Sequence, residues 1–172
     1  MSWEQTTRFV FGGYGDKPRR FHHLDELVHH LMLLGTLPFA EANTISELDH
    51  GLQTAALLRE YDGDDPELHA AGLLHDLAHV WDVPTMPRHA NLAADAVRPL
   101  FGARVADLIR GHADTAAFAG HPDFDTIMAL RAADQGARVP QKEVPQLGYW
   151  LPTLRELASR SDGSRSLPTN TH

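Results

Sequence analysis

The 172-residue chain contains no cysteine. This absence excludes disulfides, thiolate metal sites and a cysteine nucleophile, and it is typical of a cytosolic protein. The chain also lacks any apolar run near the roughly 20 residues that span a bilayer, and its first 20 residues lack the apolar core of a signal peptide. We therefore expect a cytoplasmic protein that does not enter a membrane.

Basic stretches are absent as well, and the formal net charge is −8. Binding to a phosphate backbone requires concentrated Lys and Arg, so no nucleic-acid partner is expected. The length suits one domain with a sizeable core. We predict a single domain over residues 1–160 that begins with an irregular arm to residue 20, a metal-binding core over 44–140, and a disordered tail over 161–172.

Apolar spacing and end signals predict about seven helical segments, without convincing strand alternation or a repeat. Thr44 with Glu47 has the form of a capping box, and Asp65 followed by Pro66 indicates a helix start. The predicted segments are 24–34, 44–57, 65–79, 89–101, 104–112, 123–136 and 143–158, with loops over 83–87 and 113–122. The fold class is predicted to be all-α.

Histidine is abundant, with 12 residues, and five of them combine with two aspartates in a dispersed pattern. The members are His50, the adjacent pair His75 and Asp76, His79, His89, His112 and Asp134. Imidazole nitrogens and carboxylate oxygens form the ligand set that suits iron, manganese or zinc. Because the helical segments distribute these residues along the chain, the pattern predicts a metal centre built from several helices.

The His75-Asp76 dipeptide suggests how two metals would share this centre. Neighbours on a helix diverge by about 100°, which fits a carboxylate that bridges two metals beside a histidine that binds one. His79 follows three residues after Asp76, so the three residues would overlap in direction on one helix. We interpret His79 as a residue that orients the ligands rather than binding metal itself.

Each residue of the pattern has a structural explanation when taken alone. His50 has apolar neighbours and fits a buried core histidine, His89 fits a surface histidine at a helix start, and His112 fits a histidine at the negative end of a helix dipole. Asp134 fits an ordinary helix carboxylate. The combination favours the metal centre, because the structural explanation would require several independent coincidences.

The remaining histidines are predicted to have structural or solvent-facing positions. His69 lies six residues before His75 and is expected to point away from it. The doublets near the first helix are expected to face solvent, as are the acidic residues of the 62–65 turn. Besides His69, the histidines outside the pattern are His22, His23, His29, His30, His121 and His172.

Several segments resemble the HD-domain superfamily of metal-dependent helical enzymes, over roughly residues 44–140. The resemblance is carried by LDHGLQTAALL (48–58), AAGLLHDLAHV (70–80), RHANLAADAVRPLFG (88–102), the isolated His112 and LRAADQGARVP (130–140). Within the superfamily they are most similar to the mixed-valent di-iron oxygenases, whose best-known member oxidises amino-hydroxyethylphosphonate with carbon–phosphorus cleavage. The resemblance implies an HD-domain helical bundle with two iron ions (Fe2+/Fe3+), with Mn2+ or another divalent metal as the alternative.

The resemblance also implies roles for individual residues. The ligand positions fall on His50, His75, Asp76, His89, His112 and Asp134, with Asp76 as the bridge. His79 matches the last residue of the family's HD-x-x-H string, where many HD phosphohydrolases have a lysine instead. Arg131 matches an arginine that helps hold the substrate anion, although an intrahelical pair with Asp134 is an alternative.

Three positions depart from the phosphonate enzyme. Glu41 and Asn43 stand where its substrate loop has Tyr-x-Glu, and Ala116 stands where it has a lysine. These departures predict a different small anionic substrate, such as a hydroxy acid, an amino acid or a phosphonate without the amine. If the phosphonate is nevertheless the substrate, Arg88 is the candidate to replace the lysine.

The leading functional hypothesis is an O2-dependent oxygenase that hydroxylates its small-molecule substrate or cleaves a C–X or C–P bond. Six protein ligands on two irons leave positions for substrate and O2, and the HDLAH string favours this hypothesis. The alternative is a dinuclear HD phosphohydrolase acting on a phosphate ester or nucleotide, in which the metals activate a bridging water. A third alternative is an HD module that binds a ligand without turnover. The sequence does not predict an oligomeric state.

Overall fold

A computed structural model describes residues 19–39, 44–81 and 88–163, which form six α-helices and two 3-10 helices. In chain order the elements are α2 (Leu24–Leu34), α3 (Glu47–Tyr61), α4 (Pro66–Leu74), η1 (Leu77–Trp81), α5 (Arg88–Ala113), η2 (Thr115–Phe118), α6 (Phe124–Gly136) and α7 (Leu147–Gly163). No strand occurs in these three ranges, where an isolated bridge joins Pro38 and Ser46. The all-α prediction is confirmed. Residues 1–18 of the predicted arm, the loop over 83–87 and residues 164–172 of the predicted tail lie outside the described residues. Residues 161–163 of that tail are helical and belong to α7, so the disorder predicted for them was wrong.

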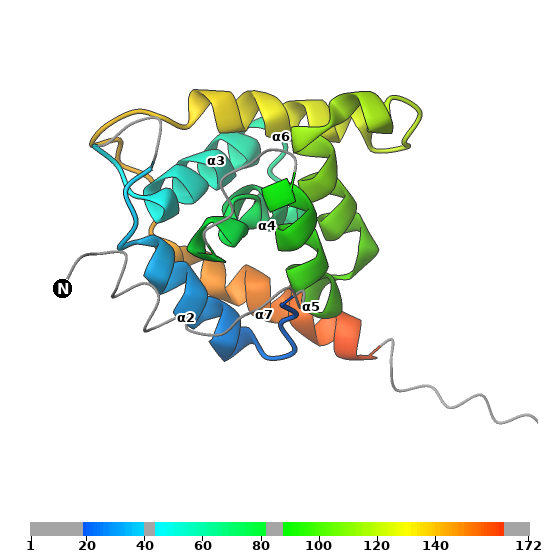
Figure 1. Ribbon diagram of the computed structural model, residues 1–172, viewed down its shortest axis with the longest axis horizontal. Helices are drawn as coiled ribbons and strands as arrows, with labels where there is room; N and C mark the ends of the chain where they lie inside the picture. Colours follow the sequence, from blue (N-terminus) through cyan, green and yellow to red (C-terminus); the bar gives the residue numbers. More distant parts are fainter. Residues whose placement is uncertain (1–18, 40–43, 82–87, 164–172) are drawn as a thin grey trace, which may run out of the picture.

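The short helix α4 lies in the middle of the bundle in Figure 1, and it contacts α3, α5, α6 and α7. All of its residues from Leu68 to Leu74 are buried. A helix that is apolar on every side is typically enclosed by others, and the sequence AAGLL at the end of α4 has this character. The residues that follow Leu74 are therefore delivered into the interior of the protein.

The start of α3 differs from the predicted capping box. The Ser46 hydroxyl accepts a hydrogen bond from the Asp49 backbone N–H at 3.0 Å, and the Asp49 carboxylate accepts one from the Ser46 backbone N–H at 3.0 Å. The box is therefore formed by Ser46 and Asp49, and the assignment to Thr44 and Glu47 was wrong. Both pairs have the same spacing, so the sequence pattern alone did not choose between them.

The predicted continuous helix over 65–79 was also wrong, because α4 ends at Leu74. His75 keeps right-handed helical backbone angles, but the chain then tightens into η1, where the His79 backbone N–H bonds to the Asp76 carbonyl oxygen at 3.0 Å. The last carbonyls of a helix lack intrahelical partners. One of them, on Gly72, accepts a hydrogen bond from the His75 ring Nδ1 at 2.8 Å.

Two predicted helices, over 89–101 and 104–112, join into the single element α5 with a kink. Gly102 has φ 85° and ψ −172°, a conformation that residues with a side chain rarely adopt. The kink follows Pro99 and separates a first half that carries His89 from a second half that carries His112. The number of helices is therefore six in the described residues, close to the about seven that were predicted.

Beyond α5 the boundaries shift from those predicted. The loop over 113–122 contains η2, and α7 starts at Leu147 rather than at residue 143. Asp123 occupies the N-cap position of α6 without a side-chain cap bond. Its carboxylate instead accepts a hydrogen bond from Arg104, whose guanidinium also bonds to Asp65 and Glu67 near the start of α4. Arg104 thus connects α4, α5 and the start of α6.

Burial corrects the interpretation of His30 and of the turn residue Asp65, which were predicted to face solvent, and it gives His69 a structural position. His30 is 4% exposed and packs against Phe21, and His69 is 5% exposed and bonds to the Asp62 carbonyl oxygen. Asp65 is part-buried by its bonds to Arg104 and to the Leu68 backbone N–H. His22, His23 and His29 are exposed as predicted.

Within the described ranges, no helix combines the length and the apolar character that crossing a membrane demands. The apolar side chains of the helices instead gather into one core cluster that includes residues of α2 through α7.

Candidate metal centre

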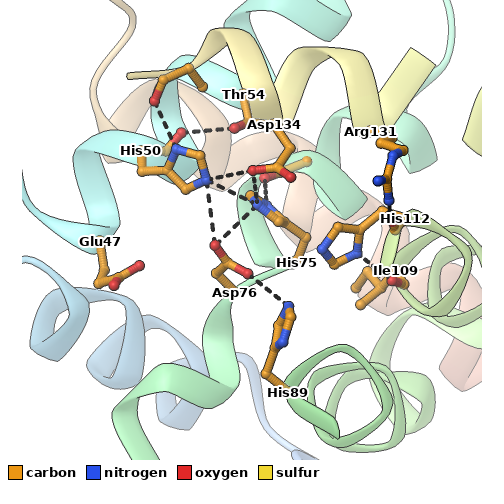
Figure 2. Close-up of polar contacts among 12 residues, drawn as sticks. Glu47, His50, Thr54, His75, Asp76, His89, Ile109, His112, Arg131 and Asp134 are labelled. Carbon is orange, nitrogen blue, oxygen red and sulfur yellow. Dashed lines mark hydrogen bonds and ion pairs between the residues drawn. The ribbon is translucent and has the colours of Figure 1, made fainter. Parts of the chain in front are cut away.

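The six residues predicted as ligands are delivered by four parts of the bundle. His50 lies on α3, His75 and Asp76 follow α4, and Asp134 lies on α6. The two halves of α5 carry His89 and His112. Figure 2 shows their side chains pointing into the interior between these elements. Residues up to 84 positions apart in the chain (50 to 134) are therefore brought together, as the spacing predicted.

A first group of four residues forms the centre of this arrangement. The Nε2 atoms of His50 and His75 are 3.1 Å apart. Asp134 Oδ1 lies 3.0 Å from His50 Nε2 and 3.5 Å from His75 Nε2, and Asp76 Oδ2 lies 3.4 and 3.3 Å from the same two nitrogens. One donor atom from each residue lies within 4.8 Å of all the others, so the group can hold a metal ion.

Backbone carbonyls fix the rings of three of the four histidines predicted as ligands. His50 Nδ1 bonds to the Ala137 oxygen at 2.7 Å, His75 Nδ1 to the Gly72 oxygen at 2.8 Å, and His112 Nδ1 to the Ile109 oxygen at 2.5 Å. Because a carbonyl only accepts, each Nδ1 carries the hydrogen. In the neutral ring, the lone pair therefore belongs to Nε2, the atom that a metal would bind.

This tautomer has a consequence for His50 and His75. In their neutral forms, two imidazole lone pairs face each other among two carboxylate oxygens, and all of these groups are acceptors. Such an arrangement is unfavourable unless positive charge lies among them, as a proton or a metal cation. The chemistry of the donor set thus fits a bound cation.

The acid–base behaviour of the group follows the same logic. Burial lowers the pKa of His75, but Asp76 and Asp134 outweigh burial and raise that pKa well above its ordinary value. His50 behaves similarly, because burial is outweighed by hydrogen bonds with Asp134 and Asp76, which raise its pKa. Burial opposes ionisation of Asp76 and Asp134, but the neighbouring histidines hold the pKa of each carboxyl well below its usual range. The group therefore favours bound positive charge.

The other carboxylate oxygen of Asp76, Oδ1, faces two further histidines. It lies 3.3 Å from His89 Nε2 and 3.9 Å from His79 Nε2. These three residues form a second group whose donor atoms lie within 4.8 Å of one another. The two oxygens of one carboxylate thus face two different histidine groups, which is the geometry of a bridging ligand. Figure 2 shows Asp76 between the His50–His75 pair and His89.

His112 lies beside these groups, with its ring centroid 4.9 Å from that of His75 and 5.5 Å from that of His89. It is 1% exposed. Burial, with a smaller contribution from the charge of His75, lowers the pKa of His112 to about 4. The ring is therefore neutral at physiological pH and has an Nε2 lone pair, as a metal ligand requires.

Arg131 contacts the centre through the backbone rather than through Asp134. Its Nη1 donates a hydrogen bond to the His112 carbonyl oxygen at 3.0 Å (Figure 2). The alternative intrahelical pair with Asp134 is not among the ion pairs of the described residues. Arg131 thus connects α6 to the end of α5 next to the candidate ligand His112.

Of the four residues that bear on phosphonate binding, the structure describes two. Glu41 and Asn43 lie outside the described residues. Ala116 is exposed on η2, and Arg88 is exposed at the first position of α5. Ala116 and Arg88 therefore add no donor to the two groups described above.

Sequence reasoning missed three features of the centre. It did not identify the carbonyls that orient the histidines, because any residue can supply a carbonyl. It did not identify Phe39, whose ring stacks on His50 at 4.2 Å with an interplanar angle of 17°. It assigned Glu47 to a helix cap, whereas Glu47 Oε2 lies 3.0 Å from His79 Nδ1. The signal for Glu47 was a carboxylate three residues before a candidate ligand.

A comparison with protein-family models places this geometry in a known group. The HD domain model matches residues 48–139, which is more than half of the chain and includes all six candidate ligands. The chain belongs to the HD domain family. A search of curated proteins finds no match. Membership and the His/Asp groups together indicate a metal-dependent HD enzyme.

Proposed function

We propose that this HD domain is a dinuclear-iron, O2-dependent oxygenase that acts on a small anionic metabolite. The observation that carries the proposal is the position of Asp76, whose two oxygens face two separate histidine groups at 3.3–3.4 Å and 3.3 Å. A carboxylate in this position is suited to join two metal ions. The nitrogen-rich donor set of imidazoles and carboxylates suits iron.

In this proposal, His50, His75, Asp134 and Asp76 would hold the first ion. Asp76, His89 and His112 would hold the second. Bound iron would supply the redox chemistry with O2. The chain supplies fixed imidazole tautomers, because each Nδ1–H of His50, His75 and His112 is already bonded to a carbonyl.

The surroundings of the centre support chemistry that excludes bulk water. The four histidines assigned to the two ions (His50, His75, His89 and His112) are between 0% and 2% exposed, and the Phe39 ring stacks on His50. Arg131 is anchored beside the second ion's His112. A guanidinium has five donors in a planar fork that suits a carboxylate or phosphonate, so we assign Arg131 to the anionic end of the substrate. The HD-x-x-H string ending at His79 supports oxygenase over phosphohydrolase chemistry, as in the family it resembles.

Turnover with two different metals tests this proposal. The purified protein, reconstituted anaerobically with Fe2+, is mixed with a panel of hydroxy acids, amino acids and amino-hydroxyethylphosphonate, and O2 consumption is followed. The same protein loaded with Mn2+ is mixed with phosphate esters and nucleotides, and phosphate release is followed. Asp76→Asn serves as the inactive control, because it removes the charge that both ions would share.

Substrate-dependent O2 consumption that requires iron and is lost in Asp76→Asn is the expected result. Given the departures at Ala116 and in the substrate loop, we expect a hydroxy or amino acid to stimulate O2 consumption more than the phosphonate does. Phosphate release without O2 consumption would instead establish the phosphohydrolase and overturn the oxygenase.

A further inference from the structure

A carboxylate–histidine pair, Glu47 with His79, lies at the edge of the metal centre beside Asp76 and His89. Glu47 is 5% exposed although it is the first residue of α3, and its Oε2 lies 3.0 Å from His79 Nδ1. A buried carboxylate is costly unless it is paired. His79 is the ion-pair partner that the described residues provide. The pair joins α3 to η1 across the edge of the centre.

The pair also determines which nitrogen of His79 is available. The negative charge of the Glu47 carboxylate, whose Oε2 lies 3.0 Å from Nδ1, favours the neutral tautomer of His79 that carries the hydrogen on Nδ1 and the lone pair on Nε2. That Nε2 lies 3.9 Å from Asp76 Oδ1, which in turn lies 3.3 Å from His89 Nε2. The available nitrogen therefore faces the same carboxylate oxygen as His89 does.

These separations are compatible with one shared ion. Nitrogen and oxygen ligands bind zinc-like ions at about 2.1 Å, so two atoms on the same ion lie at most about 4.2 Å apart. Both measured separations are below this limit. The ring centroids of His79 and His89 are 5.1 Å apart, so the two imidazoles are neighbours on this side of Asp76.

The contacts favour a different role for His79 from the one first expected, which was orienting another ligand. Orientation of a ligand histidine requires a partner at its second ring nitrogen. For His50, His75 and His112 that partner is a backbone carbonyl of Ala137, Gly72 or Ile109. His79 is itself the oriented histidine, and Glu47 is the residue that orients it.

We propose that His79 is a further ligand of the second metal ion, in addition to Asp76, His89 and His112, and that Glu47 is its positioning residue. The inference rests on the dinuclear centre of the proposed function. The His79 side chain is 27% exposed, against 3% for His89 and 11% for Asp76. His79 is therefore the most solvent-accessible of these three residues, and a small substrate would reach the second ion from its side.

Metal binding to the whole chain tests this inference without turnover. Fe2+ alone is titrated anaerobically into metal-free wild type, His79→Ala, Glu47→Gln and the double variant, with affinities from calorimetry and iron per chain from elemental analysis. His22→Ala is the matched control, because His22 is an exposed histidine. Circular dichroism with one iron bound verifies that each variant is folded.

Wild type and His22→Ala are expected to bind two ions. His79→Ala should keep the first ion and lose about 100-fold or more in affinity for the second, while Glu47→Gln should lose roughly 10–100-fold, the range typical for residues that orient ligands. Because Glu47 acts through His79, Glu47→Gln should add nothing further in the His79→Ala background.

Two ions with wild-type affinity in His79→Ala would overturn the inference and leave the dinuclear proposal intact. A loss from Glu47→Gln that persists in the double variant would overturn the positioning role of Glu47. Wild type that binds a single ion would contradict both the inference and the proposed function.

Discussion

At the scale of single residues, the centre depends on hydrogen bonds that leave the metal-binding atoms exposed to one another. Three backbone carbonyls hold the Nδ1 atoms of His50, His75 and His112. The Nε2 atoms of His50, His75 and His89 lie 3.0–3.5 Å from oxygens of Asp76 or Asp134. Acceptors held in this way gain stability only when a cation joins them. Residues near the centre are expected to differ according to whether they contact substrate or metal.

A substitution at Arg131 distinguishes contact with substrate from contact with metal. A lysine at position 131 keeps one positive charge but loses the planar fork that binds a carboxylate or phosphonate through two hydrogen bonds. Arg131→Lys is therefore expected to raise KM by about 10-fold or more, equivalent to one good hydrogen bond to a charged group, and to leave iron content unchanged. Steady-state kinetics and elemental analysis measure both. Unchanged KM would contradict a substrate contact, and lost iron would indicate that its bond to His112 positions a ligand.

His30 provides a pH-dependent prediction away from the metal centre. Burial lowers the pKa of His30, and its Nε2 has no hydrogen-bond partner in the described part of the chain. Below the ordinary pKa of 6.5, the unfolded chain therefore binds more protons at this residue than the folded protein does. The stability contributed by this difference is present above pH 6.5 and is lost as the pH falls below it.

Urea unfolding at pH 7 and pH 5, with chelator present, measures this effect. Wild type should lose more unfolding free energy between the two pH values than His30→Phe, which cannot take up the proton. The comparison between the two proteins isolates His30, because the other titrating groups are common to both. Equal losses in the two proteins would show that His30 does not contribute.

At the scale of elements, the sequence predicted which helices exist better than it predicted where each helix begins and ends. The segment over 24–34 matches α2 at both ends, because an amphipathic face and a following Gly35 define it locally. The end of α4 at Leu74 was missed, because it depends on a contact between the His75 ring and a carbonyl. The residue set of the centre was predictable from residue type and spacing, whereas the Glu47–His79 contact depends on how α3 packs near η1.

The kink in α5 is the element-scale feature that most directly positions ligands. Gly102 has φ 85°, and a Cβ there would have open space, since its nearest neighbour is Ser161 Oγ at 4.0 Å. Gly102→Ala should therefore destabilise through backbone strain alone, by about 1–3 kcal/mol. Because His89 and His112 lie on opposite sides of the kink, affinity for the second ion should fall as well.

Chemical unfolding and iron titration measure these two effects. Gly120→Ala is the control, because a Cβ at Gly120 would meet no atom within 4 Å and this glycine does not have a positive φ. Similar stabilities for the two alanine variants would show that the conformation at Gly102 is not required.

At the scale of the whole molecule, metal and fold are expected to stabilise each other. The candidate ligands come from α3, the turn after α4, both halves of α5, and α6, so an ion bound by the native arrangement finds no such site in the unfolded chain. Iron at 100 times its Kd should add about 2.7 kcal/mol to the free energy of unfolding. For a chain of this size, that corresponds to a rise in Tm of roughly 5–10 °C.

Thermal unfolding with iron and with chelator checks this expectation. Asp125→Asn, a change at an exposed carboxylate of α6, should retain the full rise, and Asp76→Asn should lose most of it. A rise of the same size in Asp76→Asn would mean that iron stabilises the protein at another place.

Electron paramagnetic resonance of the iron-loaded protein after partial oxidation tests the central claim most directly. Two irons joined by Asp76 should give the signal of a coupled mixed-valent Fe2+/Fe3+ pair, with two irons per chain, and a small anionic substrate should change the shape of that signal. Asp76→Asn should lose it. A signal from isolated ferric iron alone, at one iron per chain, would contradict a dinuclear centre and the oxygenase built on it.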